Sequence, residues 1–226
     1  MSLRPALFGL AAAVAALPAQ DSGPVGLLER AATAYRSARS VRAPFEQQLT
    51  NPLTATTHVA RGEFTQRGQR RFALRFTDPA GDAIVSDGMF VWMYLPSTAK
   101  GQVIKLPSAA GAGLDFIGEL LTAPRDHYAV AALGLENVEG HECLLFALAP
   151  KSPRAPFISA KVWIGIEDAL LWQLETVEPS SLVRKVRFTA VHLNGALRNG
   201  VLTFEPPPGT RIVDQQSLVG GTPRKP

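Results

Sequence analysis

The chain has little cysteine: its only one, Cys143, rules out an intramolecular disulfide. Cys143 lies in the strand-like run HECLLFALA, where burial as a small hydrophobic residue is expected. No cysteine follows the apolar N-terminal segment, although a lipid-anchored bacterial protein would need one there to carry its acyl groups. We therefore expect a protein that is soluble after processing.

An excess of one charge sign is also absent. The 23 Lys and Arg residues nearly balance the 19 Asp and Glu residues, and the two signs are interspersed along the chain. A nucleic-acid-binding domain would gather its basic residues on one face. We expect no nucleic-acid partner, and the pI near 9.5 predicts only a mild attraction to acidic surfaces.

Long hydrophobic runs are missing, apart from one near the N-terminus. Residues 6–17 are apolar, Arg4 precedes them, and small residues continue to Ala19. This run is too short for an ordinary membrane span, and its layout is that of a secretory signal. We expect residues 1–19 to be a signal peptide and the mature protein to be exported; the alternative is a buried or uncleaved helix.

Catalytic motifs are scarce. His127 and His141 have acidic neighbours, but neither shows the i, i+4 pairing of a zinc helix or a C-x-x-C partner. The G-x-S-x-G elbow of a hydrolase is absent, and the Gly-Ala-Gly of residues 111–113 lacks the rest of a nucleotide-binding fingerprint. We expect no enzyme, no metal site and no cofactor; a hydrolase using one of the two histidines is the alternative.

The residues that are present predict one domain over residues 20–214. The chain has 226 residues, 46% of them hydrophobic, which is enough for a sizeable core. Residues 22–24, Ser-Gly-Pro, predict the start of a helix, with Arg36 on its polar side. The apolar stripe of this helix contains Leu28, Ala31, Tyr35 and Ala38.

From Pro44 onward the apolar pattern changes to period two, with turn residues every eight to twelve positions. Residues 160–178 predict a hairpin about Glu167-Asp168-Ala169, and residues 183–197 a strand ending at Asn194-Gly195. Residues 200–214 predict a strand, a proline break and a final short strand. The excess of strands over helices predicts a large antiparallel sheet that is curved or nearly closed.

Two of the expected strands differ in their faces. RRFALRFT, residues 70–77, alternates between an apolar face and a wet face that carries Arg75. IVSDGMFVWMYLP, residues 84–96, predicts a hairpin whose Asp87-Gly88 turn suits a type I′ conformation, with positive φ at both residues. After this turn both faces are apolar, so the second face needs a cover of protein or ligand.

PSAAGAGLDFIGELLTAP, residues 107–124, interrupts the strands. Gly111 and Gly113 give a flexible approach to a short helix. A helix this short is unstable alone and needs a surface on which to pack. Its role is either a lid or a fixed plug of the sheet's open side.

An ordered series of motifs resembles the LolA family of periplasmic outer-membrane lipoprotein carriers over residues 41–214. Each motif is weak alone, but their shared order makes the resemblance specific. The motifs are Ala43-Pro44-Phe45-Glu46-Gln47, Gly62-Glu63-Phe64, Asp78-Pro79, Ile84-Val85-Ser86-Asp87-Gly88, Val91-Trp92-Met93-Tyr94, Phe204-Glu205-Pro206-Pro207-Pro208-Gly209-Thr210 and Val213-Asp214.

The resemblance implies a mainly β (α+β) fold: an unclosed antiparallel β-barrel whose apolar cavity is covered by an N-terminal helix and a short helical lid. It implies a monomeric periplasmic carrier that shields the acyl chains of lipoproteins. Its partners would be acylated lipoproteins, an inner-membrane ATP-driven lipoprotein-releasing complex and an outer-membrane lipoprotein acceptor. The alternative is a carrier or sensor of another lipid, such as a glycolipid, on the same fold.

Parity and position assign a set of apolar residues to the lipid-binding cavity, although the face of the second hairpin strand is unresolved. Ordinary barrel core is the alternative for all of them. The set is Phe72, Leu74, Phe76, Trp92, Tyr94, Phe116, Ile117, Leu120 and Leu121.

One departure from the family concerns the lid. The resemblance implies an arginine that hydrogen-bonds the lid, and this position falls on Gly68 here. Arg67 or Arg70 is the expected latch instead, because a guanidinium offers five donors on a long stem. The family's helix-rich tail is also missing, so we expect residues 215–226 to form a flexible tail.

Overall fold

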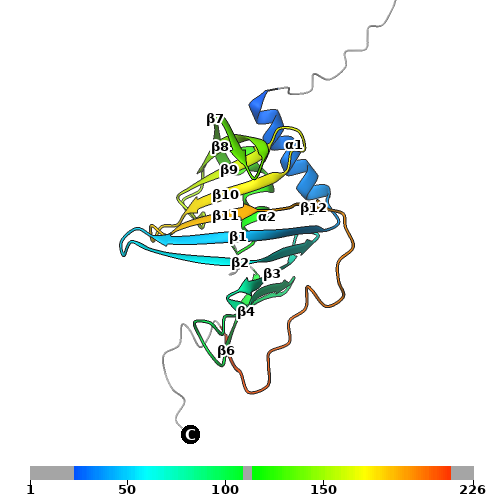
Figure 1. The fold of residues 1–226 in the computed structure, drawn as a ribbon, viewed down its shortest axis with the longest axis vertical. Helices are drawn as coiled ribbons and strands as arrows, with labels where there is room; N and C mark the ends of the chain where they lie inside the picture. Colours follow the sequence, from blue (N-terminus) through cyan, green and yellow to red (C-terminus); the bar gives the residue numbers. More distant parts are fainter. Residues whose placement is uncertain (1–22, 109–113, 215–226) are drawn as a thin grey trace, which may run out of the picture.

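A computed structural model describes residues 23–108 and 114–214 (Figure 1). The expected signal peptide, residues 111–113 and the expected tail lie outside the described residues. The helices are α1 (Pro24–Ser37), α2 (Phe116–Leu121) and α3 (Pro124–His127). The strands are β1 (Val41–Asn51), β2 (Thr56–Arg67), β3 (Arg71–Asp78), β4 (Ala80–Asp87), β5 (Phe90–Tyr94), β6 (Gln102–Pro107), β7 (Tyr128–Val138), β8 (His141–Pro150), β9 (Ser159–Gly165), β10 (Leu171–Val177), β11 (Val183–Phe188), β12 (His192–Leu193) and β13 (Arg211–Asp214).

The described strands form one curved sheet in the order β13-β6-β5-β4-β3-β2-β1-β11-β10-β9-β8-β7, with β12 paired to β1. Neighbouring strands are antiparallel except β13 and β6, which are parallel. The sheet ends at β7 on one side and β13 on the other, and these two strands do not pair. The predicted mainly β, unclosed barrel-like sheet is therefore confirmed.

The N-terminal helix α1 begins at Pro24, as predicted, with Pro in the first turn. Its stripe packs against the sheet: Leu28 and Ala31 are fully buried, and Ala38 is buried just after the helix ends. None of the helices in residues 23–108 and 114–214 has the length and the apolar composition of a membrane span.

The concave side of the sheet holds the main core. Alternate residues of the strands point inward there, and α2 lies among them behind β1 and β11 in the view of Figure 1. Ile117, Leu120 and Leu121 of α2 are at most 1% exposed and join the same cluster as Leu28 of α1 and Phe188 of β11. The short helix thus gains its stability from tertiary packing.

The convex side of β3, β4 and β5 is covered by the chain after β12. This orange segment in Figure 1 runs outside the sheet to β13. Leu202 is 4% exposed and packs with Ala73, Ala83 and Val85 of the sheet. The cover of the second apolar face is therefore protein. Residues 200–204, predicted to form a strand, instead begin as a turn in which the Thr203 N–H donates to the Gly200 carbonyl at 3.1 Å, and an arginine binds two of their carbonyls.

Arg75 is that arginine. Its Nε donates to the Val201 carbonyl at 3.1 Å and its Nη2 to the Thr203 carbonyl at 2.8 Å. The prediction that this face of β3 is wet is therefore half wrong. Ala73 on this face is 0% exposed, because the segment after β12 lies over it.

The hairpin of β4 and β5 forms where it was predicted, but not with a type I′ turn. Gly88 has φ +99°, whereas Asp87 does not take a positive φ. The Asp87 carboxylate instead accepts hydrogen bonds from the backbone N–H of Met89 and of Phe90, both at 2.8 Å. The aspartate shapes this turn through its side chain.

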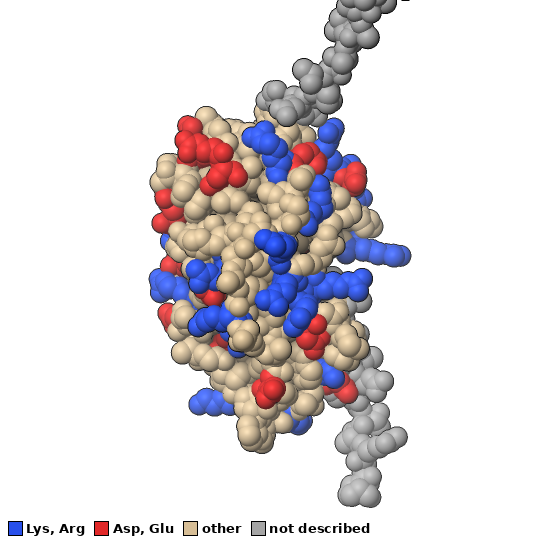
Figure 2. Space-filling view, turned by 90° about the vertical axis from the view of Figure 1, so that its right-hand side faces the viewer, with Lys and Arg blue, Asp and Glu red and all other residues tan. Residues whose placement is uncertain are grey.

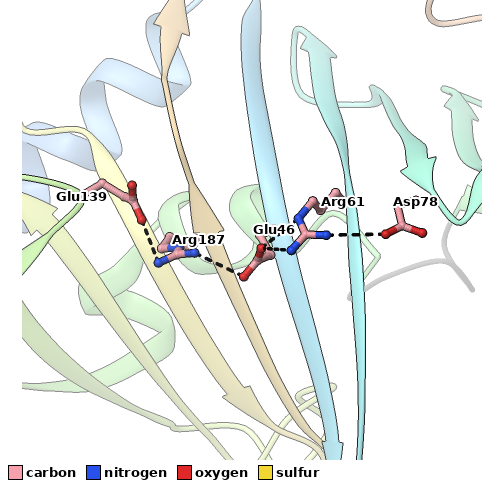
Figure 3. Close-up of polar contacts among 5 residues, drawn as sticks. All are labelled: Glu46, Arg61, Asp78, Glu139 and Arg187. Atoms are coloured by element: carbon pink, nitrogen blue, oxygen red, sulfur yellow. Dashed lines mark hydrogen bonds and ion pairs between the residues drawn. The ribbon is translucent and has the colours of Figure 1, made fainter.

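A row of alternating charges crosses the convex side further along the sheet (Figure 3). Glu46 of β1 lies at its centre, 2.8 Å from Arg61 of β2 and 3.2 Å from Arg187 of β11. Arg61 continues to Asp78 at 3.5 Å, and Arg187 to Glu139 at 2.7 Å. The hydrogen bond from Arg61 is the main cause that lowers the pKa of Glu46. Each exposed pair contributes only about 0.2–1 kcal/mol, so the row adds modestly to stability.

A second apolar cluster lies on the convex side of β8, β9 and β10. Cys143 is fully buried there, as predicted, together with Trp163 and Trp172. The His141 ring stacks on Trp172 with 3.5 Å between ring centroids. One of the two histidines considered for catalysis therefore covers an aromatic side chain.

Candidate functional site: a cavity beside the lid helix

A cavity of about 580 Å³ opens between α1, α2 and the turns that join β2 to β3 and β4 to β5. Its lining combines apolar side chains with polar groups. The lining residues are Tyr35, Arg36, Gln66, Gly68, Gln69, Arg70, Phe72, Ser86, Gly88, Val91, Ser108, Asp115, Ile117, Gly118, Glu119, Leu121, Thr122 and His127. Its volume falls in the range of sites for small organic ligands.

Three of the residues assigned to the cavity from sequence line it: Phe72 from β3, and Ile117 and Leu121 from α2. Leu74 and Leu120 point to the same concave side, but they lie in the packed core and do not line the cavity. All five residues belong to one buried cluster, and Phe72, Ile117 and Leu121 form the part of it that borders the cavity.

Phe76 is half-buried beside that core, with its ring edge-to-face against Phe45 at 5.6 Å between centroids. Phe116 belongs to α2, and its side chain lies outside the described part of the structure. The assignment of Phe76 and Phe116 to lipid binding stays a prediction.

Trp92 and Tyr94 lie on the convex side, against the expectation that they face the cavity. Both rings pack against Phe204, at 6.0 and 5.9 Å between centroids. The Trp92 Nε1–H donates to Asp87 at 2.9 Å. The concave side of β5 is taken instead by Val91, which is 1% exposed.

Asp115 caps helix α2. Its Oδ1 accepts from the Gly118 N–H at 3.0 Å, as an N-cap residue does. The Gln66 amide of β2 approaches Oδ2 at 3.5 Å. A Cβ at position 118 would lie 2.5 Å from the carboxylate, so glycine is needed there. Burial raises the pKa of the Asp115 carboxyl to about 6.

This raised pKa predicts that the protein becomes less stable as the pH rises from about 4 to about 6. In that window the unfolded chain has released the Asp115 proton, whereas the folded protein retains it. Above about pH 6 the loss levels off, at no more than about 3 kcal/mol. Asp115→Asn should remove this part of the pH dependence, since Asn also caps helices. Urea unfolding of both proteins between pH 4 and 8 measures the difference, and parallel curves would contradict the prediction.

Two further hydrogen bonds hold α2 in place. Arg36 of α1 donates from Nη1 to the Thr122 carbonyl, at the end of α2, at 2.7 Å. The Tyr128 hydroxyl of β7 donates to the Glu119 carbonyl at 2.9 Å. The predicted latches Arg67 and Arg70 donate no side-chain hydrogen bond to residues 114–122, although Arg70 lines the cavity. The sequence pattern places Arg36 only on the polar side of its helix and carries no sign of this contact.

We predict that Arg36→Met increases amide hydrogen exchange in residues 116–121 about fivefold. Losing a hydrogen bond worth about 1 kcal/mol raises the local opening constant by that factor. The methionine keeps the apolar stem of the side chain. Arg67→Met is the matched control and should leave exchange unchanged. The opposite pattern, with only the Arg67 variant loosening α2, would restore the latch expected from sequence.

His127 lines the cavity and packs edge-on against Tyr128, at 6.1 Å between ring centroids. Over residues 23–108 and 114–214, no group of three His, Cys, Asp or Glu side chains is placed to hold a metal ion. Figure 2 shows the face that lies on the right-hand side of Figure 1. Basic side chains gather across the middle of this face.

Comparison with known proteins agrees with this fold. The family model of the outer membrane lipoprotein carrier protein LolA matches residues 36–205, about three quarters of the chain. An outer-membrane lipoprotein carrier protein of Chromohalobacter salexigens is 26% identical over 202 residues, covering 89% of this chain and 93% of the relative. The protein of that description from Bordetella pertussis is 28% identical over 201 residues, with 89% and 92% covered.

A solved structure supports the fold alone. An uncharacterized conserved protein from Thermus thermophilus superposes with a TM-score of 0.54 at 13% identity, covering 84% of this chain and 97% of that one. The match of the family model over most of the chain carries the assignment, and it confirms the resemblance seen in the motifs. The chain therefore belongs to the LolA family of outer membrane lipoprotein carrier proteins.

Proposed function

We propose that this chain is a soluble periplasmic carrier that binds the acyl chains of lipoproteins and moves them from the inner to the outer membrane. It acts by binding and not by catalysis. It receives cargo from an ATP-driven complex in the inner membrane and delivers it to an acceptor in the outer membrane. Family membership and the names of the relatives support this proposal.

The observation that carries the proposal is the position of the lid helix. Ile117, Leu120 and Leu121 pack on the concave side of an unclosed sheet, and Ile117 and Leu121 also form part of the cavity wall. Each acyl methylene removed from water contributes about 0.8 kcal/mol, so a rigid open pocket would hold a multiply acylated cargo too tightly for release. When cargo displaces α2, the loss of the helix's own apolar contacts offsets much of that gain.

Native mass spectrometry of protein purified from the periplasm, with extraction of bound lipid, tests the proposal. We expect a triacylated lipoprotein or its lipid anchor. A signal from a free glycolipid, with no lipoprotein, would contradict the proposed cargo while leaving the fold unchanged.

A further inference from the structure

We propose that a polar groove next to the cavity binds the stretch of peptide that directly follows the acylated residue of the cargo. This inference rests on the proposed carrier function and extends it from the acyl chains to the polypeptide. The groove has a volume of about 760 Å³ and lies between α1 and the segment joining α2 to α3. Its lining residues are Glu29, Arg36, Thr122, Ala123, Arg125 and Asp126.

The groove and the cavity meet at one contact. Arg36 and Thr122 line both spaces, and the 2.7 Å hydrogen bond from Arg36 to the Thr122 carbonyl stands between them. If α2 moves to admit acyl chains, this bond breaks. The guanidinium of Arg36 then faces the point at which a chain leaves the cavity, where a peptide carbonyl can replace that of Thr122.

A cargo of acyl chains joined to a peptide requires an apolar space next to a polar one. The cavity and the groove differ in polarity in this way. The cavity has an apolar wall that includes Phe72, Ile117 and Leu121. In the groove, Ala123 is the one apolar lining residue. Acyl chains gain nothing from such a surface, whereas a peptide backbone carries a donor and an acceptor at nearly every residue and must satisfy both.

The charges of the groove favour a peptide over an anionic head group. Arg36 offers donors to carbonyls, and Glu29 and Asp126 offer acceptors to N–H groups. Neither carboxylate forms an ion pair or a side-chain hydrogen bond with a described residue, so both are available. A phosphate would meet the two arginines but also the two carboxylates, which would repel it.

The test compares two ligands that differ only in the peptide. One is a synthetic triacylated cysteine amide, and the other carries the additional residues Ser-Ser-Asn-Ala, also amidated. Both compete with a fluorescent palmitoyl probe for the purified protein. We expect the tetrapeptide to raise the affinity about tenfold, the effect of two or three peptide hydrogen bonds.

A double variant removes the acceptors of the groove. Glu29→Ala with Asp126→Ala should reduce the gain from the tetrapeptide to less than about twofold, and should leave binding of triacylated cysteine amide unchanged. Glu142→Ala with Glu167→Ala is the control, since these exposed side chains carry the same charge outside the groove. The control should retain the tenfold gain.

A tenfold gain in the groove variant would overturn this inference, as would the absence of any gain in the unaltered protein while triacylated cysteine amide still binds. Failure of both ligands would instead overturn the carrier function on which the inference rests.

A second measurement is independent of the carboxylates. Ala123→p-benzoylphenylalanine should photo-crosslink to the tetrapeptide, and Glu167→p-benzoylphenylalanine should not. Crosslinking of equal yield at both positions would count against the groove.

Discussion

Phe72→Glu is expected to reduce the affinity for acyl chains at least about 100-fold while the protein stays folded. Phe72 is 4% exposed and belongs to the same buried cluster as Leu74, but it also borders the cavity, together with Gln66, Gln69 and Arg70. A carboxylate at this position can reach polar partners and water when the cavity is empty. An acyl chain in the same space would separate the carboxylate from those partners and from water, which costs several kcal/mol.

Leu74→Glu should behave differently, although it lies two residues away on the same face of β3. Leu74 is 2% exposed, pairs with Phe64 and Ile84 on the neighbouring strands, and does not line the cavity. A carboxylate there has no polar partner in the core, so we expect a loss of about 4 kcal/mol or more, comparable with the whole stability of a small domain.

Circular dichroism during heating and displacement of a fluorescent palmitoyl probe separate the two effects. Phe72→Leu is the matched control for the first variant and should retain most of the binding, because it keeps the wall apolar. If Phe72→Glu protein fails to fold, Phe72 belongs to the core alone and the cavity wall must be reassigned. A folded Leu74→Glu variant that binds no lipid would show that the cavity extends deeper than its lining residues indicate.

The contrast between these two residues marks how far the sequence can be interpreted. Period-two alternation correctly put Phe72, Leu74 and Phe76 on one side of β3, because the direction of a side chain follows from strand geometry alone. Alternation says nothing of depth along that side. Whether a residue lines a cavity or the packed core depends on where α2 lies, and α2 meets the sheet through contacts distant in sequence.

Trp92 and Tyr94 show a second limit. Both faces of β5 are apolar, so period two could not tell which side was concave. The cover of the convex side has no regular structure and is held by Arg75 through backbone carbonyls, a contact that leaves no periodic signal. The hydrogen bond from Arg36 to Thr122 also leaves no periodic signal, since the two residues lie 86 positions apart in the sequence. By contrast, the aspartate directly before the apolar run of α2 is an N-cap signal that the sequence does carry.

Leu202→Asp is expected to lower the free energy of unfolding by about 4 kcal/mol and to detach the segment that covers β3, β4 and β5. Truncating a buried leucine already costs about 2–5 kcal/mol, and an unpaired charge adds to that cost. Leu202 packs against Ala73, Ala83 and Val85, which offer a carboxylate no partner. Asn199→Asp places the same charge on an exposed position of the same segment and should change stability by less than about 0.5 kcal/mol.

Detachment has a consequence beyond stability, because the segment also covers the aromatic side of β5. Phe204 packs on Trp92 and Tyr94, so losing the anchor at Leu202 should expose an apolar strip and increase binding of a hydrophobic dye. Urea unfolding and dye binding, measured on both variants, separate this from a general loss of structure. Equal stabilities would mean that Arg75 alone holds the segment in place. In that event Arg75→Met, which removes both carbonyl contacts, should produce the exposure that Leu202→Asp did not.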